Sequence, residues 1–234
     1  MNHFSSITTP SWHSHTGHGD APALALAAAL ACGLTLSVSS VCDAGTVVRG
    51  EVRLPQSAAG VDADGKQTRE PLDRRDAVVY VTVAPGLHGR TLSGRAGRKD
   101  VEIADGRLDP SVLPVVAGSR VRFRNRDRIF HRLFSVSAAG RADLGELAPG
   151  RDREHRFDRV GVSNLFCELH PAMAGFVVVC PNWYFTRPDA SGAYALPPLP
   201  RGSYVVHVWH PRRAETRRPV EVTGRGILAL DLGR

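Results

Sequence analysis

The sequence predicts an all-β protein made of two small sandwiches, and three observations support this fold class. Short runs rich in Val, with partial alternation of apolar and polar residues, recur along the chain, as is typical of strands. Gly and Pro are plentiful, at 23 and 16 of 234 residues, which favours many turns. We find no convincing amphipathic helical repeat. With 42% hydrophobic residues, the chain is long enough to bury a real core.

The expected strands fall into three groups along the chain. Residues 45–96 hold strands at 46–54 and 77–84, with a polar, turn-forming segment at 56–76 and the start of a basic, Gly-rich loop at 86–100. Residues 97–181 hold the central group, with strands expected at 112–116, 119–125, 133–137, 155–158, 162–167 and 175–180. Residues 182–234 hold the last group, with strands expected at 194–196, 203–209, 219–223 and 227–232 and a Pro-built connection at 197–202.

Residues 1–44 are expected to be a signal segment. The stretch Ala21–Cys42 carries no charge and is rich in Ala and Leu, and the small residue Ala44 follows it as a plausible cleavage point. We therefore expect an exported, for example periplasmic, protein with no membrane span after cleavage. An uncleaved anchor is the alternative, because about 20 apolar residues span a bilayer. Residues 1–20 depart from the usual signal because they contain no Lys or Arg.

The net charge of +7 is carried almost wholly by arginine, since Lys66 and Lys99 are the only lysines. The arginines are scattered through turns and strand faces without an aromatic-interleaved basic stripe, which argues against a nucleic-acid partner. A positive surface suits docking to an acidic redox partner.

One segment carries recognisable metal chemistry, Cys167-Glu-Leu-His170-Pro-Ala-Met173. Thiolate, imidazole and thioether are donors that suit copper in both oxidation states, and a spacing of three lets one tight loop present all of them. His131 is the candidate fourth donor, because the 36 residues before Cys167 accommodate strands that return the chain beside it. Zinc is the competing metal, but thioether is a poor zinc ligand. Cleavage after Ala44 leaves only Cys167 and Cys180; with Cys167 committed to the metal, we expect Cys180 to be a free, buried thiol.

The pattern Cys-x-x-His-Pro-x-Met-x-Gly at 167–175 resembles the copper loop of the cupredoxins, with the spacing of amicyanin. The region from Gly118 to His131, including Asn125, is similar to the first ligand region of that superfamily. The resemblance implies a Greek-key β-sandwich at 97–181, one copper ion held by His131, Cys167, His170 and Met173, and an apolar docking patch of Leu169, Pro171 and Ala172. Arg132 stands where cupredoxins usually carry Asn beside the first His, so the tie between the two ligand loops is expected to differ.

The flanks 46–84 and 183–210 resemble a carboxypeptidase regulatory-like β-sandwich, and the combination resembles bacterial methylamine-utilisation or plastocyanin-like proteins. The resemblance implies one-electron transfer between redox protein partners, with no open coordination position and so no enzymatic turnover. Two alternatives stay open: a periplasmic copper chaperone or store, and a carbohydrate- or protein-binding sandwich with incidental copper. His207 and His210 are expected on opposite faces of a strand, one toward the core and one toward solvent.

Overall fold

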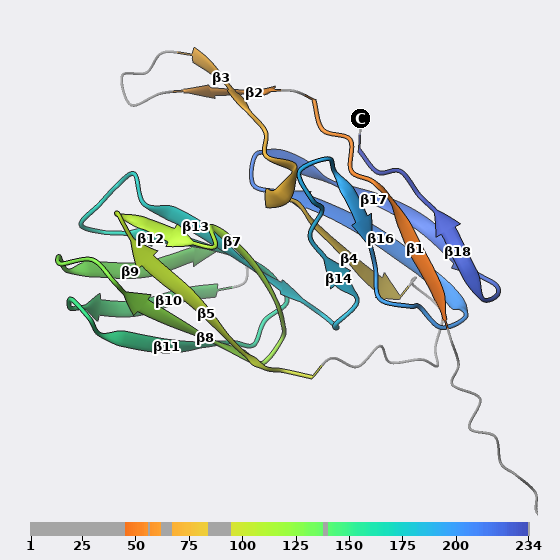
Figure 1. The fold of residues 1–234 in the computed structure, drawn as a ribbon. Helices are drawn as coiled ribbons and strands as arrows, with labels where there is room; N and C mark the ends of the chain where they lie inside the picture. The colour runs from red at the N-terminus through yellow and green to blue at the C-terminus, as the bar shows by residue number, and fades with distance from the viewer. Residues whose placement is uncertain (1–44, 56, 62–66, 84–94, 138–139, 234) are drawn as a thin grey trace, which may run out of the picture. The chain divides into compact units, whose positions relative to one another are not determined.

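The computed structural model describes residues 45–233 except residues 56, 62–66, 84–94 and 138–139 (Figure 1). The predicted signal segment 1–44 and most of the loop predicted at 86–100 therefore lie outside the described residues. Within them, every regular element is a strand apart from one 3-10 turn at Arg74–Asp76. The all-β prediction is confirmed.

The central part of the chain forms the first sandwich from two sheets (Figure 1). Its strands are β5 (Arg98–Ala104), β6 (Arg107–Asp109), β7 (Val112–Val116), β8 (Ser119–Asn125), β9 (His131–Ser137), β10 (Gly140–Leu147), β11 (Asp152–Phe157), β12 (Gly161–Cys167) and β13 (Ala174–Cys180). One sheet has the order β10-β9-β12-β13-β7 and the other the order β11-β8-β5-β6. Both sheets contribute side chains to one buried cluster, which makes them the two layers of a sandwich.

Strand β8 shows why these residues form this layer. Val121 and Phe123 alternate with arginines, so the apolar side chains face the core and the charged ones face water. Strand β7 is buried at every position instead. Leu113 and Val115 pack in the core of the sandwich, while Val112 on the other face belongs to a separate buried cluster.

The segments before and after this region form a second sandwich. Its strands are β1 (Thr46–Glu51), β4 (Val78–Val83), β14 (Phe185–Thr186), β15 (Ala193–Ala195), β16 (Gly202–His210), β17 (Arg213–Val222) and β18 (Gly226–Ala229). The sheet orders are β15-β1-β18 and β14-β4-β16-β17. Val48, Val79, Leu199 and Val206 are among the side chains of its core, none of them exposed. Strands β2 (Ser57–Val61) and β3 (Gln67–Pro71) pair as a hairpin in the segment predicted as turns.

Several strands differ from the sequence prediction. Strands β5, β6 and β10 were not predicted, and residues 98–100 belong to β5 rather than to the basic loop. The alternation in β10 is broken by a register shift between Asp143 and Gly145, which hides the period of two. Strand β17 starts six residues earlier than expected. Its first half is polar and so lacks the alternation by which strands were predicted.

The prediction for His207 and His210 is wrong, because both side chains are buried. The register of β16 against β17 shifts between Val208 and His210. The extra residue lies in β17, where Arg213 to Thr216 spans three residues against two in β16. Neighbouring groups cover both rings instead: His207 stacks on Tyr80, and His210 Nε2 lies 3.2 Å from the Asp73 carbonyl.

A third buried cluster consists of Val78, Val112, Val178 and Cys180, with Tyr80, Phe176 and Trp209 among the side chains packed against it.

No helix in the described ranges is long and apolar enough to cross a membrane.

Candidate metal centre

The loop between β12 and β13 brings Cys167 and His170 together. Cys167 is the last residue of β12, and the chain turns back so that Phe166 pairs with Ala174 at the start of β13. The Met173 amide donates to the His170 carbonyl at 2.9 Å, and the Cys167 amide donates to the Met173 carbonyl at 3.3 Å. These two bonds close a tight loop that directs the His170 ring back toward Cys167.

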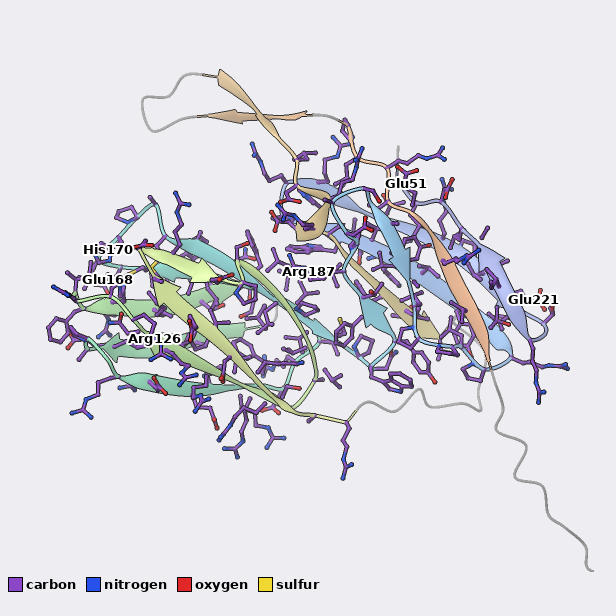
Figure 2. The ribbon with its side chains drawn as sticks, viewed as in Figure 1. Glu51, Arg126, Glu168, His170, Arg187 and Glu221 are labelled. Carbon is purple, nitrogen blue, oxygen red and sulfur yellow. The ribbon has the colours of Figure 1, made fainter. Side chains whose placement is uncertain are left out.

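Strand β9 supplies His131 from the neighbouring strand. Leu133 pairs with Cys167, and His131 lies two residues away on the same face of the sheet. The Cys167 Sγ is 3.8 Å from His131 Nδ1 and 3.5 Å from His170 Nδ1. All three donor atoms lie within 4.8 Å of one another, and the two rings are 4.7 Å apart between centroids. His170 lies at the end of the first sandwich where the β12–β13 loop turns (Figure 2).

Asp127 fixes the orientation of the His131 ring. Its Oδ2 is 2.9 Å from His131 Nε2, which leaves Nδ1 facing Cys167. The same carboxylate accepts hydrogen bonds from the amides of Asp105 and Gly106 at 2.7 and 3.0 Å. Burial alone would raise the pKa of Asp127, but these amide bonds and the His131 contact outweigh it and lower the pKa. Asp127 lies within the region from Gly118 to His131, but the sequence alone did not reveal its role.

Asn125 organises the loop that carries Asp127 and His131. Its buried side-chain amide donates to the carbonyls of Ile129 and Leu147 at 2.8 and 3.0 Å, and its Oδ1 accepts from the Asp127 amide at 3.0 Å. The side chain thus uses both its donors and its acceptor to hold the chain between β8 and β9. These hydrogen bonds hold the loop and do not touch the donor atoms, so the supporting role expected for Asn125 stays a prediction.

Arg132 ties the two ligand-bearing segments together by a different route from an asparagine. Its carbonyl accepts from the Glu168 amide at 2.9 Å, and its Nε lies 2.8 Å from the Glu168 carboxylate. A second ion pair joins Arg132 to Asp143 at 2.9 Å. The tie therefore runs from Arg132 to Glu168, which is the residue directly after Cys167. The sequence did not reveal this role of Glu168.

The donors differ in exposure. His131, Cys167 and Met173 are buried, whereas His170 is partly exposed. Met173 packs in the same buried cluster as Cys167, which places its thioether in the core of the sandwich rather than in solvent. Its role as the fourth donor stays a prediction.

Apolar side chains surround the exposed edge of His170. Leu169 is 52% exposed, and Pro171 and Ala172 are exposed beside it. Ile129 and Phe130, each 49% exposed, are two further large apolar side chains, in the loop that precedes His131. They were not predicted from the sequence, although two large apolar residues in a polar loop are the signal that would have found them.

The donor set fits copper better than zinc. Among the described residues, one group of three or more His, Cys, Asp or Glu side chains can hold a metal, and it consists of His131, Cys167 and His170. A structural zinc site would need a fourth Cys, His or carboxylate donor. The Asp127 carboxylate is engaged with His131 Nε2, on the side of the ring away from Cys167, and Met173 packs in the same buried cluster as Cys167. Thiolate, two imidazoles and a thioether are the donors that copper prefers.

The comparisons with known proteins gave matches to solved structures alone. The chain matches no protein-family model and no curated protein sequence. It is similar to a novel purple cupredoxin from Nitrosopumilus maritimus, at 25% identity over 34% of this chain and 97% of that chain, with a TM-score of 0.31. It is also similar to a reduced amicyanin mutant, at 24% identity over 43% of this chain and 98% of that chain, with a TM-score of 0.33. A third similar structure is a copper-containing nitrite reductase from Thermus scotoductus, at 21% identity over 40% of this chain and 24% of that chain, with a TM-score of 0.33. Each of these similarities covers less than half of this chain.

Proposed function

We propose that the chain is an exported blue-copper protein that passes single electrons between redox partners. One observation carries the proposal: a buried cysteine thiol and two histidine Nδ1 atoms lie within 4.8 Å of one another at one end of a β-sandwich. When bound, copper would supply a reversible one-electron change between Cu(I) and Cu(II).

The residues of this chain have distinct tasks in that function. Cys167, His131 and His170 are the proposed equatorial donors, and Met173 is the proposed weak axial donor. Asp127 keeps a proton on His131 Nε2, so that Nδ1 is free to bind. Three of the four proposed donors are buried, and a site filled by four protein donors would leave no open position for a substrate.

A rigid fold around the proposed donors suits electron transfer. If the donors keep similar positions in both oxidation states of the metal, little structural rearrangement accompanies each electron. His131 and Cys167 lie at the ends of paired strands, and the tie between Arg132 and Glu168 joins their segments. The partly exposed His170, ringed by Leu169, Pro171 and Ala172, is the proposed exit for the electron.

The first test is to add Cu(II) to the purified chain beginning at Gly45. We expect an intense blue absorption band from charge transfer between Cys167 and copper, which cycles with ascorbate and ferricyanide without loss of metal. Met173→Leu should keep the band and raise the reduction potential, because the axial donor that helps to stabilise Cu(II) is lost.

His131→Ala is the matched variant for an equatorial donor and should abolish the band. A full band in His131→Ala, or a colourless wild-type protein that binds Cu(II), would contradict the proposed ligand set. Copper that exchanges readily during redox cycling would favour copper handling over electron transfer. Export is tested separately, since the mature protein should begin near Gly45.

A further inference from the structure

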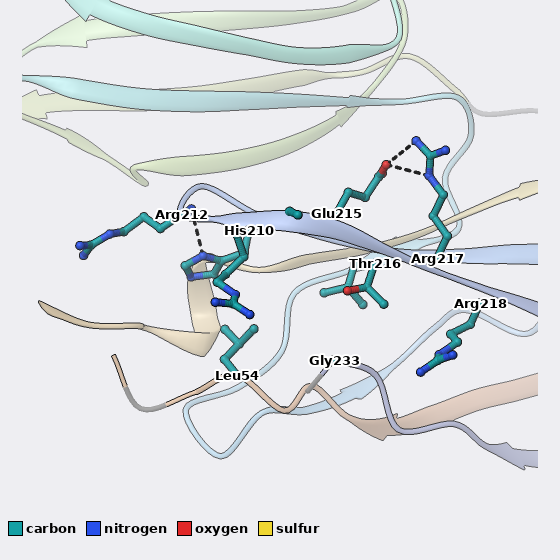
Figure 3. A pocket seen from close by; sticks show the side chains of 11 residues that line it. Leu54, His210, Arg212, Glu215, Thr216, Arg217, Arg218 and Gly233 are labelled. Carbon is teal, nitrogen blue, oxygen red and sulfur yellow. Dashed lines mark hydrogen bonds and ion pairs between the residues drawn. The ribbon is translucent and has the colours of Figure 1, made fainter. Parts of the chain in front are cut away.

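A hollow of about 500 Å³ lies at the edge of the second sandwich, away from the residues proposed to bind metal (Figure 3). One wall is the β16–β17 hairpin, where Val208 pairs with Thr216. Leu54 and Gly233 form the opposite wall. The volume is within the range typical of ligand pockets in proteins.

The face of β17 that lines this hollow changes from apolar to polar along the strand. Val220 and Val222 point into the apolar core of the sandwich. Two and four residues earlier, Arg218 and Thr216 occupy the same face, opposite the core residues Val206 and Val208. A guanidinium and a hydroxyl therefore stand where the strand pattern calls for core side chains.

The positive charge on this side of the strand is not cancelled by the neighbouring carboxylate. Glu215 and Arg217 also line the hollow, but the Glu215 carboxylate is engaged, because it accepts hydrogen bonds of 2.9 and 2.7 Å from Arg217 (Figure 3). The other Glu215 oxygen accepts from Tyr80 and lies 3.1 Å from His207 Nδ1. Among the ion pairs of the described residues, none joins a carboxylate to Arg213 or Arg218, the exposed arginines at either end of the hollow.

Protection of a sheet edge is the rival explanation for Arg218, because β17 is an edge strand and inward-pointing charges prevent edge-to-edge pairing. Pro219 already interrupts the donors of this edge. Edge protection also needs neither a hollow nor a hydroxyl beside the charge. The arrangement therefore exceeds what that explanation requires.

We propose that this hollow binds an acidic oligosaccharide. The planar guanidinium of arginine can donate two parallel hydrogen bonds to the two oxygens of one carboxylate. Arg213 and Arg218 pair with His210 and Val206, four residues apart on β16, so they lie about 13 Å apart along the strand. This separation suits carboxylates spaced along one ligand better than a single compact anion. The apolar side chains of Leu54 and Val208 suit the carbon framework between the charges, and the Thr216 hydroxyl suits sugar hydroxyls. This site does not depend on the metal centre.

The test is calorimetric titration of the full chain with trigalacturonate at low ionic strength, with maltotriose as the neutral sugar. We expect trigalacturonate to bind and maltotriose not to bind. Arg218→Ala should weaken binding about tenfold or more, since hydrogen bonds to charged groups are lost. Arg218→Lys should keep part of the affinity, because lysine keeps the positive charge but cannot donate the paired hydrogen bonds of a guanidinium. Arg225→Ala, which removes an exposed arginine from the turn before β18, is the matched control and should bind like the wild type.

Three results would overturn the proposal. They are the absence of trigalacturonate binding to the wild type, equal or tighter binding of tripolyphosphate or of an acidic peptide, and full affinity in a folded Arg218→Ala variant. If Arg218→Ala aggregates but its monomer fraction binds like the wild type, the residue protects the edge and the proposal is wrong. Circular dichroism of each variant separates loss of the site from loss of the fold.

Discussion

The carboxylate of Asp127 connects two loops and one histidine ring. Because it contacts His131 Nε2 and accepts two backbone amides, it decides which ring nitrogen faces Cys167. Residues that orient a metal-binding histidine in this way often change metal affinity 10- to 100-fold, roughly, when they are mutated. Asp127 is thus a positioning residue for the proposed site.

Asp127→Ala should therefore weaken copper binding about 10- to 100-fold and shift the position of the blue band, because the His131 ring loses its fixed orientation. Competition with a copper chelator and an absorption spectrum measure the two effects. Asp105→Asn is the control: its backbone amide still donates to Asp127, and Asn tolerates the left-handed conformation at this position (φ 52°). An Asp127→Ala variant with wild-type affinity and spectrum would show that other contacts hold the ring.

Cys180 is the second informative residue. As expected from the sequence, it is free and buried. Burial raises the pKa of its thiol to about 12, so the thiol stays protonated across the neutral range. Its contribution to stability is full below the unfolded thiol pKa of about 8.5 and is lost as pH rises toward the folded pKa.

We expect Cys180 to resist iodoacetamide at pH 8 in the native protein and to react fully after unfolding, since the thiolate is the reactive form. Peptide mass spectrometry measures the labelling, and the peptide that contains Cys167 reports separately on the metal loop. Rapid labelling of Cys180 in the folded chain would mean that the third cluster opens readily.

At the scale of a single element, β8 carries an outward ladder of charge. Its outward residues Arg120, Arg122 and Arg124 form ion pairs with Asp100 and Glu102 on β5 and with Asp152 and Glu154 on β11. The ladder covers the outer face of the sheet with paired charges of both signs. Exposed pairs of this kind contribute little individually.

The pKa of Asp100 is lowered, first by its hydrogen bonds from Arg122 and then by the charges of nearby arginines. Because the pKa of Asp100 is lowered, the ionised carboxylate stabilises the fold at pH values above the ordinary carboxyl pKa of 3.8, and this stability is lost as the pH falls below it. Asp100→Asn should lower the thermal midpoint at pH 7 by no more than about 2 °C and leave it unchanged near pH 2. Equal effects at both pH values would show that packing, not charge, is responsible.

The same elements show what the sequence reveals and what it does not. Strands β7, β8 and β13 were predicted because their apolar residues follow the pattern of a buried or half-buried strand. The first half of β17 and the bulged β10 were not predicted. Their residues are polar or out of phase, and pairing with a neighbouring strand rather than side-chain burial decides their structure.

At the scale of the whole molecule, two separate cores stabilise the chain. Leu199 belongs to the core of the second sandwich, and Leu133 belongs to the core of the first, two residues from His131. Neither side chain is exposed, so truncation leaves a cavity in each case.

Leu199→Ala and Leu133→Ala should each lower the free energy of unfolding by about 2–5 kcal/mol, because similar apolar volume is lost. Only Leu133→Ala should also change the blue band, because Leu133 pairs directly with Cys167. Chemical denaturation and absorption spectroscopy of the two variants test this. A changed band in Leu199→Ala would reveal coupling from the second core to the proposed copper site.

The candidate site was only partly accessible from the sequence. The spacing of Cys167, His170 and Met173 pointed to a metal loop because all three donors lie in one short segment. The partners of the donors were hidden, since Asp127 acts through loop geometry and Glu168 acts through the carbonyl and side chain of Arg132. The Glu168 contact depends on how two distant segments meet, and the Asp127 contact depends on the shape of one loop; local sequence patterns encode neither.

The strand order of the two sandwiches has a consequence for how the chain is made. Thr46 pairs with Gly226, and Val83 pairs with Tyr204, whereas the strands of the first sandwich all pair within Arg98–Cys180. Synthesis proceeds from the N-terminus, so β4 has no partner strand until β14 and β16 are made, and β1 has none until β15 and β18 are made. Contacts between such distant segments also form slowly. All strands of the first sandwich are therefore made before the strands that complete the second one, so the first sandwich can fold, and bind the proposed metal, first.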